Sequence, residues 1–505
     1  MRKDQGRYSS LTRWLFISLV VQLSCPLILA AQLYQRERLE IPLARNELSF
    51  DVLSADESGV VLYRNQSLLS QDLQLIHVDT SFRQKWTGLL PVEKKFQVVK
   101  QTGDSRKSFF LFSARDYSDI NFHLYEVRLD QGAFSKFIIR NVIPFLPTHF
   151  EVTTSGALIG GYYAGRIPVI LYFEFATLRS RILPGLFNEP GELIQISTNQ
   201  DNSFTILISA KNHLKQKTLW VKSYTPQGEL IQNTILTPRD NSGLLFGRIV
   251  PVGSTGQLVG GVYGQRNSDF SRGIFLARLD PEGNHEMRYY PFADLQNFFQ
   301  YLKAKREQRI KERIARRKIR GKKIRFQYRF LIHEVVEYNN EYVLLGEAFY
   351  PRYRNIERNY AYGSNTQFGS VVFDGYQYTH AIVIGFDRSG ALLWDNSFEI
   401  NDIRSFTLEQ FVKMDVQNDK IALLYLYNDR IRSKVIQDNM VLEGKIMSNL
   451  STQSDEDPLA DAGGYNKLDY WYDDTFLAHG VQQLSQKRFA RQSRRVFFVN
   501  KLAYR

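Results

Sequence analysis

The sequence predicts an all-β fold built from a repeated unit, and three observations support this. Phe and Tyr are abundant, with 35 and 28 residues in a chain of 505, and Val and Thr gather in short runs, a composition typical of strands. Hairpin-like stretches recur in which Asp or Pro is followed by Gly or a polar residue, as in GFDRSGALLWDNSF at 385–398. From Asp79 to Asp280, successive turns of this kind lie about 46–55 residues apart.

Each period contains more than one hairpin. A hydrophobic strand rich in Leu, Gly and aromatic residues precedes the turn, for example GQLVGGVYG at 256–264 and KIALLYLYN at 420–428. Four strands in about 50 residues, repeated along the chain, indicate the blades of a β-propeller. Seven full units are predicted to start near Leu48, Phe96, His149, Leu193, Phe246, Phe330 and Phe411.

An eighth unit is incomplete at the C-terminus, where three strands end with RRVFFVNKLAYR at 494–505. The missing outer strand is supplied by RLEIPLA at 38–44, which would join both ends of the chain in one blade and remove an open edge. We therefore predict an eight-bladed ring, with seven blades as the main alternative. An open solenoid or two stacked sandwiches are further alternatives.

Residues 1–31 form a basic start followed by an apolar stretch that ends in small residues, which is typical of a secretory signal peptide. An uncleaved anchor and lipidation at Cys25 are the alternatives. Residues 32–505 are predicted to form a single propeller domain that is exported to the periplasm, the outer membrane or the medium, with no integral membrane span after cleavage.

Cys25 is the only cysteine, so the mature chain has no structural disulfide, cysteine nucleophile or thiolate metal site. Its eight histidines are scattered without metal-ligand spacing, and no nucleotide-binding or serine-hydrolase motif is present. We therefore predict no metal and no cofactor, and the sequence identifies no catalytic residue.

The positive charge is concentrated in one segment. Residues 303–325 contain thirteen Lys or Arg and two Glu, a formal +11 in a chain of +13. We predict an inserted basic helical segment at 293–327, with Asp294 as N-cap of a docked base over 294–302 and a protruding basic part beyond it. Its candidate binding residues are Arg306, Arg309, Arg313, Arg316, Arg317, Lys318 and Arg320. A solvated charge run without a partner is the alternative, as is pairing with the acidic loop at 451–464.

A second insertion at 350–381 is predicted to be a loop rich in Tyr and Arg, a mixture that suits sugars or peptide surfaces. Its candidate binding residues are Tyr350, Arg352, Tyr353, Arg354, Tyr360, Tyr362, Tyr376 and Tyr378. In a four-stranded meander, both insertions and the acidic loop leave the disc by the same face. We expect binding on that face, because loops on a rigid scaffold carry most binding sites.

The AQ junction after the leader, the strand-rich repeats and the ending WYDDTFLAHG…VFFVNK resemble exported β-propeller proteins of Bacteroidetes-type bacteria. The resemblance covers most of residues 35–505. It implies the propeller fold and an envelope location, and it supplies no activity or catalytic residue.

These features favour a binding or scaffold protein of the cell envelope over an enzyme. The expected partner is an envelope protein, an anionic glycan or a lipid head group bound through the basic segment, and export argues against nucleic acid. The alternative function is a carbohydrate-active hydrolase or lyase whose site lies at the axial mouth of the propeller. Paired carboxylates in an open axial pocket would favour that alternative, and a plugged apolar axis would favour the scaffold.

Overall fold

The fold was analysed in a computed structural model of the chain. It describes residues 33–504 except for short internal segments at 66–71, 117, 187–189, 254–255, 323, 325, 327, 358–368, 418, 454–455, 459–465 and 487–488. The signal peptide predicted at 1–31 therefore lies outside the described residues.

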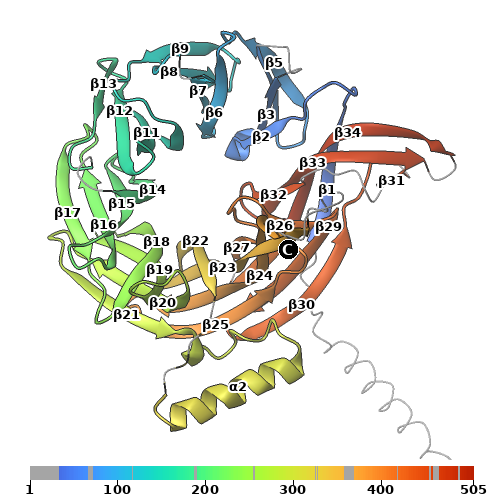
Figure 1. The fold of residues 1–505 in the computed structure, drawn as a ribbon. Coiled ribbons are helices and arrows are strands. Elements are labelled where there is room, and N and C mark those ends of the chain that lie inside the picture. The colour runs from blue at the N-terminus through green and yellow to red at the C-terminus, as the bar shows by residue number, and fades with distance from the viewer. Residues whose placement is uncertain are drawn as a thin grey trace, which may run out of the picture.

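The described strands form eight antiparallel sheets arranged in a ring, as predicted (Figure 1). In each of the first four blades the strands run in sequence order from the axis outward. These blades consist of β2 (Asp51–Ser54), β3 (Val60–Asn65), β4 (Leu73–Val78) and β5 (Gln84–Leu90); β6 (Phe96–Gly103), β7 (Lys107–Ala114), β8 (Phe122–Arg128) and β9 (Phe134–Ile139); β10 (Pro147–Val152), β11 (Gly156–Tyr163), β12 (Ile167–Glu174) and β13 (Arg179–Ile182); and β14 (Gly191–Thr198), β15 (Phe204–Lys211), β16 (Lys217–Tyr224) and β17 (Leu230–Leu236).

The next three blades follow the same order, and the predicted starts of all seven units fall within a few residues of the inner strands. These blades consist of β18 (Ser242–Val252), β19 (Gly256–Gln265), β20 (Ser271–Leu279) and β21 (His285–Pro291); β22 (Arg329–Tyr338), β23 (Glu341–Glu357), β24 (Gly369–Asp387) and β25 (Leu392–Glu399), with β26 (Arg404–Ser405) beside β24; and β27 (Lys413–Gln417), β28 (Lys420–Tyr427), β29 (Arg430–Gln437) and β30 (Met440–Asn449). Short 3-10 turns lie at Asp56–Ser58 (η1) and Phe292–Asp294 (η2), and the helix α2 spans Ala304–Ile319.

The eighth blade joins the two ends of the chain. Its inner strands β32 (Lys467–Tyr470), β33 (Thr475–Gln486) and β34 (Phe489–Tyr504) come from the C-terminus, and β1 (Leu33–Pro42) is the outer strand. β1 pairs antiparallel with β34 in the register Leu39↔Val499, which confirms the predicted closure (Figure 1). The short strand β31 (Glu456–Pro458), from the acidic segment, pairs with β33.

The hydrophobic core lies between neighbouring blades, because each sheet is apolar on both faces. At the closure point Phe497 of β34 is fully buried and its ring centroid lies 5.4 Å from that of Phe50, which leads into blade 1. Phe497 belongs to the same buried cluster as Val60 and Leu62 of blade 1. The ring is therefore closed both by backbone pairing within blade 8 and by side-chain packing between blades 8 and 1.

Replacing Phe497 with Ala tests this closure. Truncating a fully buried Phe costs about 3–5 kcal/mol of unfolding free energy, because the cavity left behind is only partly refilled. The matched control is Phe134→Ala on the outer strand of blade 2, where the side chain is 43% exposed. Urea unfolding followed by tryptophan fluorescence should show a large loss for the first variant and a small one for the second. Equal losses would contradict the role assigned to the closure.

Candidate functional site

The basic insertion joins the outer strand of blade 5 to the inner strand of blade 6, as predicted. The helix, however, begins at Ala304 rather than near Asp294, and Lys303 rather than Asp294 occupies its N-cap position. The prediction of a helix over 294–302 is therefore wrong. The apolar residues of that segment are nevertheless buried, since Leu295, Phe298 and Phe299 are at most 5% exposed. They reach the disc from a series of turns that follows η2.

An aromatic cluster anchors this insertion to blade 6. The ring of Tyr301 stacks on that of His380, with centroids 3.7 Å apart and an interplanar angle of 6°. The Tyr301 and Tyr328 hydroxyls are hydrogen bonded at 2.8 Å. Phe298 and Phe330 pack edge-on against His380, which is fully buried. Residues from both ends of the insertion therefore pack against the same histidine side chain.

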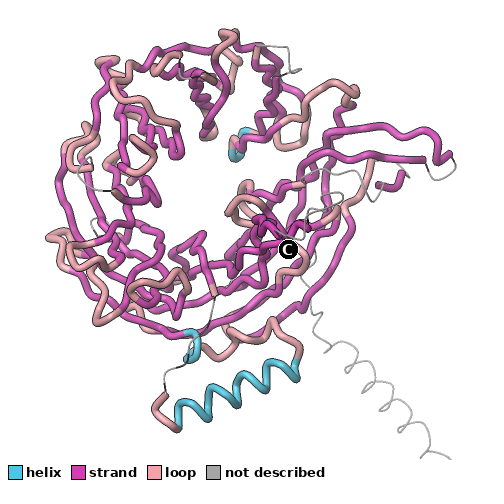
Figure 2. Tube along the Cα trace, in the orientation of Figure 1, coloured by secondary structure: helices cyan, strands magenta, loops and turns pink. Residues whose placement is uncertain are grey.

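The helix itself lies along the outside of the ring and does not protrude freely (Figures 1 and 2). Ile314 is 8% exposed and belongs to the same buried cluster as Phe298 and Phe299, with Ile310 packed against it. The predicted binding residues Arg306, Arg309, Arg313, Arg316, Lys318 and Arg320 are exposed and Arg317 is half-buried. One side of the helix therefore packs against the ring, and its basic side is exposed to solvent.

Two lysines of the helix are neutralised locally. Lys311 pairs with Glu307 at 2.7 Å, and Lys318 pairs with Asp294 at 2.5 Å. The side chains of the predicted acidic partner, residues 454–465, lie outside the described residues. In the part of that loop that is described, Ser451 bonds Gln35 of β1.

The second insertion is a β-hairpin and not the predicted loop. β23 and β24 continue past the disc and remain paired as far as Glu357↔Gly369. Tyr350, Arg352, Tyr353 and Arg354 are exposed on β23. Tyr376 is half-buried, and Tyr360 and Tyr362 lie outside the described residues.

Tyr378 is not available to a ligand. It is 1% exposed, and its hydroxyl donates to the Glu409 carbonyl at 2.9 Å and accepts from the Glu409 N–H at 3.1 Å. Its role is to attach the base of the hairpin to the segment that leads into blade 7. The hairpin thus keeps four of its predicted binding residues on an open strand.

The axis of the ring carries a feature that the sequence did not reveal. Inner strands of neighbouring blades are joined by side chains: Arg248 of blade 5 donates to the Ile194 carbonyl at 3.1 Å and to the Ile332 carbonyl at 3.2 Å. Gln195 of blade 4 bonds both the N–H and the carbonyl of Ile249. The register of β14 and β22 shifts beside these carbonyls, as expected for β-bulges that turn side chains toward a site.

These residues line an axial cavity of about 500 Å³ together with Glu334, Asp415 and Tyr470. Burial raises the pKa of Asp415 to about 6 and also raises the pKa of Glu334, whose carboxylate accepts from Gln410 at 2.5 Å. The axis therefore holds a cavity of mixed lining, with charged groups among apolar ones, and is not filled by an apolar plug. Carboxyl groups with raised pKa values beside an arginine are suited to donating or accepting protons near neutral pH.

The described residues contain neither a membrane-spanning helix nor a metal-binding cluster. No helix there is long and apolar enough to cross a bilayer. Nor does that part of the chain bring three or more His, Cys, Asp or Glu side chains together in an arrangement that would hold a metal ion.

Comparison with known proteins identifies no family for the chain. No protein-family model matches the chain, and no curated protein matches its sequence. Similar solved structures include the polysaccharide lyase Uly1 (10% identity, 91% of this chain and 90% of that one, TM-score 0.38). A eukaryotic initiation factor (10%, 92% and 92%, 0.42) and the WD40 domain of SCAP from fission yeast (7%, 94% and 98%, 0.41) are also similar. All three TM-scores are below 0.5, and no argument about this chain rests on these similarities.

The anchoring of the insertion predicts a pH effect on stability. Burial lowers the pKa of His380 from 6.5 to about 3, so the folded protein keeps this ring neutral. A group with a depressed folded pKa contributes stability above its unfolded pKa, and this contribution is lost as the pH falls from about 6.5 toward 3.

The unfolding free energy of the unaltered protein should fall as the pH is lowered, because His380 takes up a proton only on unfolding. His380→Phe should make this dependence shallower by up to about 1.4 kcal/mol per pH unit, the contribution of one proton. Urea titrations between pH 7 and pH 4 measure that slope. The exposed His213, changed to Phe, is the control and should leave it unchanged. An unaltered slope in His380→Phe would contradict the assignment.

Proposed function

We propose that the protein is an exported β-propeller that acts as a binding or scaffold protein of the cell envelope, located in the periplasm, at the outer membrane or outside the cell. The leader at 1–31 supports export, as does the resemblance to exported propellers. The binding surface is the open side of α2, and one observation carries it: the arginines of the helix form a single stripe.

The stripe consists of Arg306, Arg309, Arg313, Arg316 and Arg320, spaced i, i+3, i+7, i+10 and i+14. At 3.6 residues per turn this spacing places all five within about 80° of arc, along about 21 Å of helix. The docking residues Ile310 and Ile314 lie on a neighbouring side. The helix therefore presents cations to solvent along one line while its apolar side holds it to the disc.

These arginines are largely unused within the described fold; Arg316 donates from Nε to the Glu312 carbonyl of its own helix at 3.4 Å. Among the described residues, no carboxylate oxygen lies within 4.0 Å of the guanidinium of any member of the stripe. Five exposed cations in a row repel one another, and an anionic partner would relieve this repulsion. A guanidinium can bind carboxylate or phosphate through two parallel hydrogen bonds, which favours arginine over lysine in such a surface.

The partner is an anionic surface, either an acidic envelope protein or an anionic glycan or lipid head group, and export disfavours nucleic acid. The one large apolar side chain that is well exposed on the described helix is Ile319, at 85%. Strong insertion into a bilayer needs a broad apolar face. Recognition by this helix is therefore mainly electrostatic, and we expect it to weaken with salt.

The test compares two variants of equal charge. In the first, the five stripe arginines are changed to Gln; in the second, Lys303, Lys305, Lys311, Lys318 and Lys322 are changed to Gln. A tagged protein is used to capture partners from solubilised envelope of the source cells, and the mass of the recovered chain shows whether residues 1–31 have been removed. We expect the arginine variant to lose its partner and the lysine variant to keep it.

Equal capture by the arginine variant and the unaltered protein would overturn the proposed surface. If both variants lost the partner equally, binding would depend on net charge alone, and the arginine stripe would not be the binding surface. A full-length chain that retains its leader in the cytosolic fraction would overturn the proposed location.

The axial cavity favours a second candidate function, a carbohydrate-active hydrolase or lyase. Glu334 and Asp415 have raised pKa values and share the cavity with Arg248. Such groups are the kind needed to protonate a leaving oxygen or to remove a proton next to a carboxylate.

Asp415→Asn and Glu334→Gln test this second function without a large change in shape. Incubation of the unaltered protein with neutral and uronate-containing polysaccharides should release reducing ends or unsaturated products, and each variant should lower the rate by about 10²–10⁴-fold. Absence of any turnover by the unaltered protein on either class of polymer would remove this candidate.

A further inference from the structure

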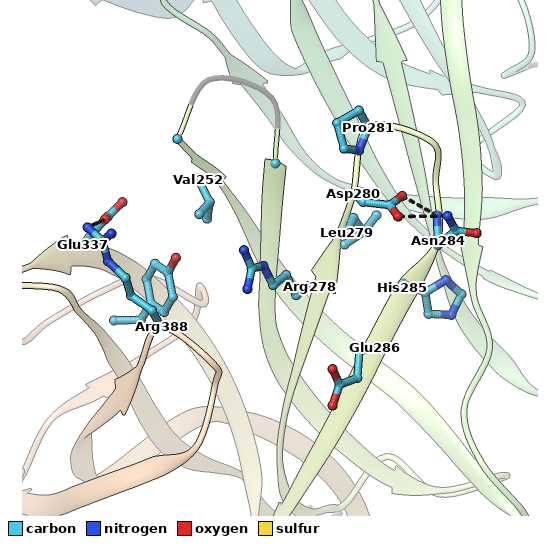
Figure 3. A pocket seen from close by; sticks show the side chains of 13 residues that line it. Val252, Arg278, Leu279, Asp280, Pro281, Asn284, His285, Glu286, Glu337 and Arg388 are labelled. Carbon is cyan, nitrogen blue, oxygen red and sulfur yellow. Dashed lines mark hydrogen bonds and ion pairs between the residues drawn. The ribbon is translucent and has the colours of Figure 1, made fainter.

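A pocket of about 740 Å³ lies between blades 5 and 6, on the face that bears the A–B and C–D turns. This is the face opposite to the insertions, so the pocket is separate from the basic helix. Its walls are β20 and the β20–β21 turn on one side, and the β24–β25 turn on the other (Figure 3). A volume of this size accommodates a ligand as large as a disaccharide or a dipeptide.

The walls are fixed by contacts between the two blades. Arg288 of β21 donates to the Ser389 hydroxyl at 3.3 Å, and the Tyr290 hydroxyl donates to the Gly390 carbonyl. Asp280 accepts from the N–H and side-chain amide of Asn284 at 2.7 and 2.8 Å, which makes the β20–β21 turn rigid (Figure 3). The pocket is therefore preformed.

The three carboxylates of the pocket are all engaged. Asp280 is used within its turn, Glu286 pairs with Arg288 at 3.2 Å, and Glu337 pairs with Arg388 at 3.2 Å. Arg278 is different: it is exposed, and no carboxylate oxygen among the described residues lies within 4.0 Å of it. Figure 3 shows Arg278 on β20 and, across the pocket, Arg388 beside Glu337. Among the charged side chains of the pocket, Arg278 is therefore the one with no ion pair or hydrogen bond to the described residues.

A tyrosine adds a further donor. The ring of Tyr342 is 2% exposed, and its hydroxyl makes no hydrogen bond to any residue that the structure describes. Tyr342 lines the same pocket as Arg278, Arg388 and Glu337. Two guanidinium groups and a phenolic hydroxyl that line one pocket are donors suited to the oxygens of a carboxylate.

We propose that this pocket binds a carboxylate carried by a small molecule of sugar or dipeptide size. Arg278 supplies the principal charge-assisted hydrogen bonds, Arg388 contributes the donors that Glu337 leaves free, and the Tyr342 hydroxyl donates to the second carboxylate oxygen. The carboxylates already engaged in the walls exclude a second negative charge, so ligands with one carboxylate are preferred over polyanions.

Isothermal titration calorimetry on the mature protein tests the proposal with two matched pairs of probes. Glucuronate is compared with its methyl ester, and N-acetyl-alanyl-alanine with its C-terminal amide. We expect saturable binding of at least one free acid and none of its uncharged counterpart, and the pair that binds shows whether the carboxylate comes from a sugar or a peptide.

Arg278→Gln should weaken binding by about tenfold or more, because a hydrogen bond to a charged group is lost, and Tyr342→Phe should weaken it by a smaller factor. The control is Arg179→Gln on the exposed outer strand of blade 3, which should bind normally. Failure of all four probes to bind would overturn the proposal, as would unchanged affinity in Arg278→Gln or preferential binding of a cationic probe such as lysine amide.

Discussion

The pairing of β1 with β34 is the constraint on which the rest of the structure depends. The first and last strands of the chain share one blade, which locks the eight sheets into a closed disc, and the pairing of Leu39 with Val499 in that blade joins residues at opposite ends of the chain. Pairing removes the open strand edge that a linear array would leave, and such edges promote aggregation. Every inter-blade feature described above, including the axial hydrogen bonds and the pocket between blades 5 and 6, requires the closed ring to hold neighbouring blades in place.

The ring also supports the binding role proposed for the basic segment. A free helix with so many like charges would be poorly stable in water, because few apolar residues support it. Here Ile314 and the cluster around His380 attach it to blade 6. A surface that is already ordered loses less conformational entropy when a partner binds, which favours affinity. Docking on the ring therefore holds the helix in one orientation, with its arginines in a row on the exposed side.

The architecture was predictable because it repeats. A period near 50 residues, hairpin turns such as that at Asp387, and apolar strands between them define the blades without any knowledge of long-range contacts. The start of the helix was not predictable. The spacing of Leu295, Phe298 and Phe299 suits a helix, but the buried Asp395 carboxylate accepts from the N–H groups of Gln296 and Asn297, at 2.8 and 2.7 Å.

That contact spans about a hundred residues and holds the segment in turns, so no local pattern signals it. The same reason applies to the axial cavity and to the pocket. Arg248 and Asp415 come from different blades, as do Arg278 and Arg388, and only the closed ring brings them together. The hairpin at 350–381 was predicted as a loop because its aromatic and basic residues obscure the strand alternation. Its residues Tyr350 and Tyr353 nevertheless remain on an open strand.

The most direct test of the account is hydrogen–deuterium exchange of the helix Ala304–Ile319 in the intact protein, followed by mass spectrometry. A docked helix on a rigid ring should exchange its backbone amides at least about a hundredfold more slowly than an unstructured peptide of the same sequence. Exchange at the peptide rate, with the blades still protected, would show that the basic segment is a solvated tail, and the oriented arginine surface would have to be abandoned.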